Sequence, residues 1–160
     1  WAFCWASGQV LARYILDNPE LVRNKRVMDF GAGSGVVAIA CAMAGAKQVI
    51  ACDIDPDALL SCQENAALNN VDYELHGDLF EFDQELDLLI AADVLYDKAN
   101  LPLLNTFLEK APEVLVADSR VKNFDFPPYQ AIGRIDSFTV PDLDELDEFR
   151  LVNLYSASRI

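Results

Sequence analysis

Three glycines at alternate positions, Gly31, Gly33 and Gly35, follow a short apolar stretch that contains one acidic residue, Asp29. Glycine tolerates a positive φ and carries no side chain, so this run permits a tight turn and lets a ligand approach the backbone closely. The apolar run 36–43 predicts a helix directly after the turn, with its free N–H groups pointing at the ligand. A carboxylate two residues before the first glycine suits a cationic amino group better than a pyrophosphate. The stretch therefore predicts a loop that binds a nucleotide-type cofactor.

The spacing of the glycines narrows the class of cofactor. A dinucleotide-binding loop has the form G-x-G-x-x-G, in which the third glycine permits close packing of helix on strand. In this chain Val36 occupies the place of that third glycine. A phosphate loop of the Walker type needs a Lys followed by Ser or Thr, and this stretch has neither. A tight strand–helix turn without any ligand stays an alternative.

Two further carboxylates follow predicted strands, Asp53 after residues 48–52 and Asp78 after residues 72–76. An acidic residue about 20 residues beyond a glycine turn, at the carboxyl end of the second strand, accepts hydrogen bonds from ribose hydroxyls. Asp78 is predicted to accept from an adenine amino group while Leu79 packs on the ring. Solvated loops would also account for both carboxylates. Three more residues complete the predicted cofactor site: Trp5, Ile54 and Ala92.

Short apolar runs alternate with helical patterns along most of the chain. This order predicts an α/β fold, a doubly wound and mostly parallel seven-stranded sheet with an antiparallel strand near one edge. Residues 1–160 are expected to form one domain. Strands are predicted at 27–30, 48–52, 72–76, 86–92, 114–117, 131–140 and 149–158, and helices at 10–17, 35–44, 56–69 and 101–111.

Composition limits the classes of partner. The net charge of −14 argues against binding nucleic acid through its phosphates. The four cysteines form no C-x-x-C pair and are expected to be core residues in a reducing compartment, and with a single histidine no metal site is predicted. No apolar run is long enough to span a bilayer. These features favour the bacterial cytosol, or an organelle matrix if a targeting segment precedes Trp1.

Longer motifs resemble a known family. The pattern D-x-G-x-G-x-G of residues 29–35, with the strand-end carboxylates, resembles class I S-adenosylmethionine-dependent methyltransferases. The stretch Asp93-Val94-Leu95-Tyr96 resembles the Asp-x-x-Tyr motif of seven-strand protein lysine methyltransferases. Residues 5–9, Trp-Ala-Ser-Gly-Gln, and the helix after them resemble the electron-transfer-flavoprotein β-subunit lysine methyltransferases and their bacterial relatives, some described as nicotinamide N-methyltransferase-like.

The resemblance covers nearly the whole chain, and it has several implications. It implies S-adenosylmethionine as cofactor, S-adenosylhomocysteine as product, and further sequence ahead of residue 1. It implies that Asp93 and Tyr96 carry the chemistry, because methyl transfer to an amine needs a neutral, well-oriented nitrogen. Tyr96 would orient the amine and Asp93 would accept a hydrogen bond from it. The simpler interpretation is that Tyr96 only shapes the wall of the site and that Asp93 only caps the next turn.

Three functions remain open at this point. The resemblance favours transfer of a methyl group to a lysine of a partner protein, such as the electron-transfer flavoprotein β subunit. The acidic loop 141–148 would suit a basic surface on that partner. A small-molecule N-methyltransferase acting on nicotinamide-like amines is the second hypothesis, and a cofactor-binding module without catalysis is the third. Nucleic acid as the substrate is disfavoured by charge.

Overall fold

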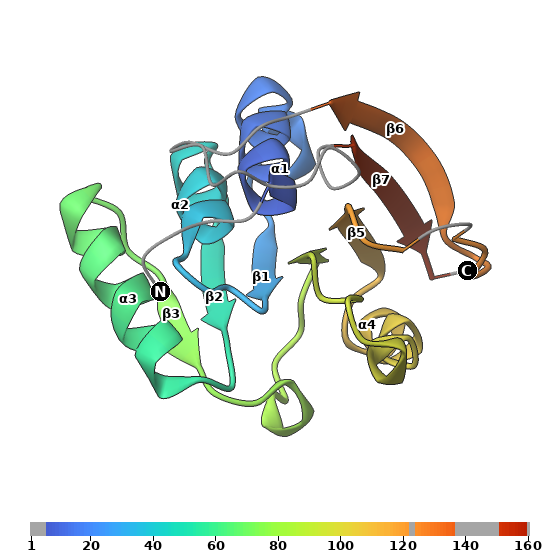
Figure 1. Cartoon of the computed structure of the whole chain (residues 1–160). Coiled ribbons are helices and arrows are strands. Elements are labelled where there is room, and N and C mark those ends of the chain that lie inside the picture. The colour runs from blue at the N-terminus through green and yellow to red at the C-terminus, as the bar shows by residue number, and fades with distance from the viewer. Residues whose placement is uncertain (1–5, 122–123, 137–150, 160) are drawn as a thin grey trace.

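The computed structural model describes residues 6–121, 124–136 and 151–159. Its centre is a seven-stranded sheet in the order β3-β2-β1-β4-β5-β7-β6, which fans across the molecule in Figure 1. All neighbouring pairs from β3 to β5 are parallel, and β7 runs antiparallel to both β5 and β6. The strands are β1 Arg26–Phe30, β2 Gln48–Cys52, β3 Glu74–His76, β4 Leu88–Ala92, β5 Glu113–Asp118, β6 Gln130–Asp136 and β7 Leu151–Ser158.

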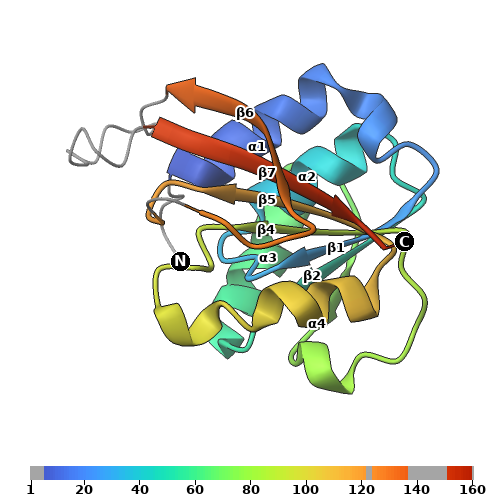
Figure 2. The same cartoon turned by 90° about the vertical axis from the view of Figure 1, so that its right-hand side faces the viewer.

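Helices cover both faces of this sheet. The helices α1 Ala6–Asp17 and α2 Val36–Met43 pack together on one face, and α4 Leu103–Lys110 lies on the other (Figure 2). The helix α3 Pro56–Leu68 joins the α1 and α2 side, since its Cys62 belongs to the same core cluster. The predicted doubly wound fold with one antiparallel strand near the edge is confirmed.

Alternate side chains along each central strand pack into two separate hydrophobic cores, because successive residues of a strand point to opposite faces of the sheet. In β1, Val27 packs with α1 and α2, while Met28 packs on the α4 side. The register of β1 with β2 and β4 repeats this alternation across the sheet, so the central strands are buried on both faces. Such burial explains why residues 88–91 form an unbroken apolar run.

Local sequence explains where α3 begins. The Asp55 side chain accepts a hydrogen bond of 2.9 Å from the backbone N–H of Asp57, and Pro56 occupies the first helical position. The helix therefore starts immediately after β2 and its short turn.

The structure differs from the prediction at several boundaries. The first helix begins at Ala6 rather than residue 10, and it includes the buried Gly8. Close packing on α2 outweighs the low helix propensity of glycine there. Residues 98–100 form a separate 3-10 turn ahead of α4. The predicted Trp5 contact and the acidic loop 141–148 lie outside the described residues.

Candidate active site

The carboxyl ends of β1, β2, β3 and β4 open onto one cleft with a volume of about 1080 Å³. Its floor includes the glycine turn, and residues of α1 and of the segment leading into α4 complete the walls. In a doubly wound sheet this edge is where ligands bind. Every predicted site residue in the described part of the chain lines the cleft: Asp29, Gly31, Gly33, Asp53, Ile54, Asp78, Leu79, Ala92, Asp93 and Tyr96.

The glycine turn has the backbone that its sequence predicts. Gly31, Gly33 and Gly35 have φ values of 70°, 56° and 85°, a region that L side chains rarely adopt. The Gly33 N–H donates to Oδ2 of Asp53 at 2.9 Å, and Oδ1 of Asp53 accepts from the Asp55 N–H at 3.0 Å. Asp53 therefore ties the turn after β1 to the turn after β2. Sequence reasoning missed this contact.

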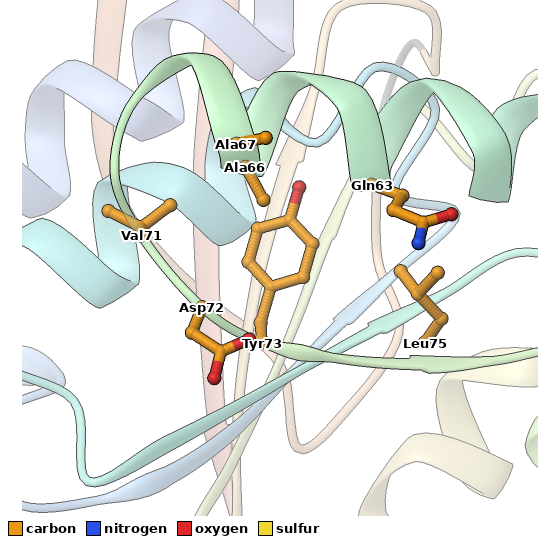
Figure 3. Close-up of a pocket in the computed structure, with 7 residues that line it drawn as sticks. All are labelled: Gln63, Ala66, Ala67, Val71, Asp72, Tyr73 and Leu75. Atoms are coloured by element: carbon orange, nitrogen blue, oxygen red, sulfur yellow. The ribbon is translucent and has the colours of Figure 1, made fainter.

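A second, smaller hollow of about 250 Å³ lies between α3 and β3. Figure 3 shows Tyr73 reaching across it toward the helix. The Tyr73 hydroxyl donates to the Cys62 carbonyl, and it lies 2.7 Å from where a Cβ on Gly35 would be. Tyr73 therefore limits the space beside the turn, and only glycine fits at position 35 without a shift.

Asp29 lies at the base of the cleft and is only 2% exposed. Its Oδ2 accepts a hydrogen bond of 3.0 Å from the Ala38 N–H in the first turns of α2. Neither of the two ion pairs among the described residues includes Asp29. Burial raises the pKa of this carboxyl to about 7, with the charge of Asp53 adding to the rise and the Ala38 hydrogen bond opposing it. A cationic group placed beside it would favour the ionised form.

Asp29 should make the stability of the unliganded protein depend on pH. In the unfolded chain its carboxyl titrates near 3.8, so between about pH 4 and pH 7 the folded state holds the extra proton. The free energy of unfolding should therefore fall as the pH rises through this window, by up to roughly 4 kcal/mol. Urea unfolding of Asp29→Asn should lack that part of the decline, whereas exposed Asp72→Asn should follow the wild type. Parallel curves for wild type and Asp29→Asn would contradict the argument.

The remaining predicted cofactor residues occupy the rim and one wall. Asp78 accepts from the Phe80 N–H at 2.8 Å and so caps the 3-10 turn Leu79–Glu81. Leu79 is 2% exposed and packs mainly in the core on the α4 side. Ile54 is 85% exposed at the edge of the cleft. The predicted adenine contacts of Asp78 and Leu79 stay predictions.

Asp93 follows β4 with a left-handed backbone, φ 51°. Its Oδ1 accepts two hydrogen bonds from Ser119, from the N–H and from Oγ, each 3.0 Å long. Its Oδ2 is buried and has no hydrogen-bond partner within the described ranges. Tyr96 is 74% exposed on the same loop, and Asn100 holds that loop by donating to the Val94 carbonyl at 2.8 Å. The cleft therefore ends in a fixed carboxylate and an open aromatic ring.

The polar run Asp118-Ser119-Arg120 was not assigned a role from sequence. The structure brings it to the cleft beside Asp93, where Arg120 lines the wall. Its position at the carboxyl end of a buried strand could have indicated a place in the site, since the carboxyl ends of neighbouring parallel strands meet at one edge of the sheet. The strand order placed β5 next to β4 and so made the contact possible.

Neither a metal-binding cluster nor a membrane-spanning helix is found in the described part of the chain. Within residues 6–121, 124–136 and 151–159, no three His, Cys, Asp or Glu side chains gather where they could hold a metal ion. None of the helices in that same part of the chain has the length and apolar character needed to cross a membrane.

Comparisons with known proteins agree with this geometry. The electron transfer flavoprotein beta subunit lysine methyltransferase of Rattus norvegicus is 34% identical over 156 residues, 92% of this chain and 61% of that protein. The chain thus spans less than two thirds of that relative's length. A ribosomal protein L11 methylase from Lactobacillus delbrueckii subsp. bulgaricus has a TM-score of 0.70 at 23% identity, over 96% of this chain and 79% of that one.

A magnesium protoporphyrin IX methyltransferase from Synechocystis PCC 6803, solved with bound SAM, shares the fold. It has a TM-score of 0.67 at 17% identity, over 97% of this chain and 80% of that one. The model of the family described as "Ribosomal protein L11 methyltransferase (PrmA)" matches residues 10–118. These residues run from the first helix through the glycine turn to the last residue of β5. The chain therefore belongs to the ribosomal protein L11 methyltransferase (PrmA) family.

Proposed function

We propose that this chain is an S-adenosylmethionine-dependent methyltransferase that transfers a methyl group to a lysine amine of a partner protein. The observation that carries the proposal is one cleft with two chemically different ends. One end has the glycine turn with Asp29 and Asp53, and the other has Asp93 and Tyr96 on the loop after β4. Family membership and the similarity to a lysine methyltransferase support the same reaction.

The cofactor end suits the parts of S-adenosylmethionine. Asp29 would pair with the cationic amino group of the methionine portion, which would offset the cost of burying its carboxylate. Asp53 keeps lone pairs for the ribose hydroxyls while it holds Gly33 and Asp55. Asp78 would accept from the adenine amino group, and Ile54 would cover the ring.

The acceptor end suits an amine. A free lysine amine has a pKa near 10.4 and must lose its proton before it can attack. Its lone pair then forms the N–C bond while the S–C bond of the sulfonium breaks, and positive charge passes from sulfur to nitrogen. Asp93 would accept a hydrogen bond from the attacking nitrogen, and Tyr96 would orient it with its hydroxyl or ring face. These side chains would then act most strongly in the transition state.

The acceptor we favour is a lysine on the electron-transfer flavoprotein β subunit or a similar folded protein. The named substrate of the rat relative and the net charge of −14 support it, because an acidic protein attracts basic surfaces and repels nucleic-acid phosphates. The described cysteines are all free and buried, which fits a reducing compartment such as the cytosol or an organelle matrix.

Cofactor affinity should depend on Asp53. Loss of its charge-assisted bonds to the ribose should weaken binding of S-adenosylhomocysteine by roughly 1.5–3 kcal/mol, about tenfold to hundredfold. Titration calorimetry of Asp53→Ala measures this, with exposed Asp57→Ala on the neighbouring helix as the matched control. Since Asp53 also anchors the glycine turn, Asp53→Asn should lose less. A folded Asp53→Ala protein with unchanged affinity would remove Asp53 from the site.

Purified acceptors test the substrate class. The protein is incubated with S-adenosylmethionine and, in parallel, with electron-transfer flavoprotein β subunit or nicotinamide, and products are read by mass spectrometry. We expect methylated lysine on the protein and no methylated nicotinamide. Methylated nicotinamide with an unmodified protein would favour the small-molecule alternative. Tight binding of S-adenosylhomocysteine with no product on either acceptor would favour a non-catalytic module.

A further inference from the structure

Ser119, which directly follows β5, contacts the carboxylate of Asp93. Ser119 gives both of its donors to Oδ1 of Asp93, and the Asp93 N–H donates to the Ala117 carbonyl at 2.9 Å. Two hydrogen bonds therefore fix Oδ1 of the carboxylate, and a third holds the Asp93 backbone to the neighbouring strand end. Its other oxygen, Oδ2, is buried and lacks a partner in the described part of the chain. No hydrogen bond among the described residues therefore offsets the burial of this oxygen.

Asp118, the last residue of β5, is a second buried carboxylate. It is 1% exposed, and its Oδ2 accepts from the N–H groups of Arg120 and Val121 at 3.0 and 2.6 Å. Its Oδ1 has no partner among the described residues. A neutral Asn side chain would accept the same two N–H groups, so the turn alone does not require a buried negative charge.

The protonation of Asp118 depends on its burial and on the charge of Asp93 in the candidate active site. Burial raises the pKa of Asp118, and the charge of Asp93 raises it further, while the Val121 and Arg120 hydrogen bonds and the Arg120 charge oppose the rise. Burial raises the pKa of the Tyr155 phenol on β7, the charge of Asp118 adds to the rise, and Arg134 on β6 opposes it. The register of β4 with β5 pairs Ala92 with Ala117 and so places the two carboxylates on neighbouring strand ends, where their charges affect one another.

We propose that Asp118 and Ser119 are positioning residues for Asp93: Ser119 fixes the orientation of the carboxylate, and Asp118 in its ionised form adds negative charge at the neighbouring strand end. The inference rests on the proposed function. During transfer the nitrogen lone pair forms the N–C bond, the S–C electron pair goes to sulfur, and the positive charge moves to the nitrogen. Preorganised negative charge at that end stabilises the transition state more than the ground state. The surplus N–H proton leaves to solvent afterwards.

A double-mutant cycle tests the role of Ser119. Ser119→Ala should lower kcat roughly tenfold while leaving the affinity for S-adenosylhomocysteine unchanged, because the hydroxyl acts only on Asp93. In the Asp93→Asn background the same change should have almost no further effect. Ser156→Ala on β7 is the matched control and should behave as wild type. An equal tenfold loss in both backgrounds would overturn the positioning role of Ser119.

The substitution Asp118→Asn removes the negative charge of the side chain and keeps its shape. The amide oxygen keeps the two backbone hydrogen bonds, so the turn should persist while kcat falls roughly tenfold with little change in KM for the cofactor. Asp136→Asn, an exposed carboxylate at the end of β6, is the matched control. Full activity of folded Asp118→Asn would overturn the electrostatic role.

One measurement does not depend on activity. Carbon-13 NMR of labelled aspartate carboxyls follows the titration of Asp118 in the wild type and in Asp93→Asn. Because the Asp93 charge raises the pKa of Asp118, the titration in Asp93→Asn should move to lower pH. An unchanged titration would show that the carboxylates do not interact and would overturn the proposal. Absence of any methylated product with a shifted titration would contradict the proposed function and leave the pair intact.

Discussion

Gly33→Val should abolish measurable binding of S-adenosylhomocysteine, a loss of at least about hundredfold in affinity. Position 33 lines the cleft, so a branched side chain would occupy space that the cofactor needs. The residue also has φ 56°, a conformation that costs a β-branched residue roughly 1–3 kcal/mol, and its N–H is held by Asp53. Calorimetric titration of the folded variant measures the effect.

The matched control for backbone strain is Gly45→Val. Gly45 has φ 96° beyond the end of α2 but does not line the cleft, and a Cβ there would lie 3.8 Å from Arg23. Gly45→Val should therefore lose stability in thermal unfolding and keep its cofactor affinity. If Gly33→Val binds as tightly as this control, the glycine turn is not the cofactor loop.

Asp93→Asn should reduce kcat on the protein acceptor on the order of a hundredfold and leave cofactor affinity nearly unchanged. The carboxylate is fixed by Ser119 with one oxygen free, so its interaction with the acceptor nitrogen should be strongest as positive charge develops there. Single-turnover measurements with the enzyme saturated with cofactor separate this step from binding. Tyr96→Phe should show a smaller loss in the same assay.

An exposed carboxylate in the β3–β4 segment provides the comparison for Asp93. Asp83→Asn keeps the same change of charge but lies away from the cleft lining, so its kcat should equal that of the wild type. Full activity of Asp93→Asn on the true acceptor would remove Asp93 from the reaction. A large loss of cofactor affinity instead would move Asp93 to the cofactor end of the cleft.

Much of the fold could be predicted because its central strands are short, apolar and bounded by turn residues. The prediction for residues 48–52 matches β2 completely, and Asp53 follows it as expected. The first helix was placed too late, because Gly8 reads as a break in the sequence but lies within α1, which packs on α2. The strand β6 is almost wholly exposed at the sheet edge, so its sequence carries little periodic signal.

The residues that line the site were easier to predict than the contacts that they make with one another. Carboxylates after parallel strands must meet at one edge, which is why Asp29, Asp53, Asp78 and Asp93 line a single cleft. The contacts of Asp93 with Ser119 depend on the left-handed backbone at Asp93 and on the register of β4 with β5. Neither feature can be read from residue types and spacing alone.

The most direct test of the central claim is the chemical class of the labelled product. The protein is incubated with S-adenosylmethionine carrying a radiolabelled methyl group and an extract that contains proteins, nucleic acids and metabolites. Digestion with protease or nuclease and mass spectrometry then locate the label. The account predicts label on lysine of a protein, lost when that lysine is replaced by arginine and absent with Asp93→Asn. Label confined to a small metabolite or to nucleic acid would contradict it.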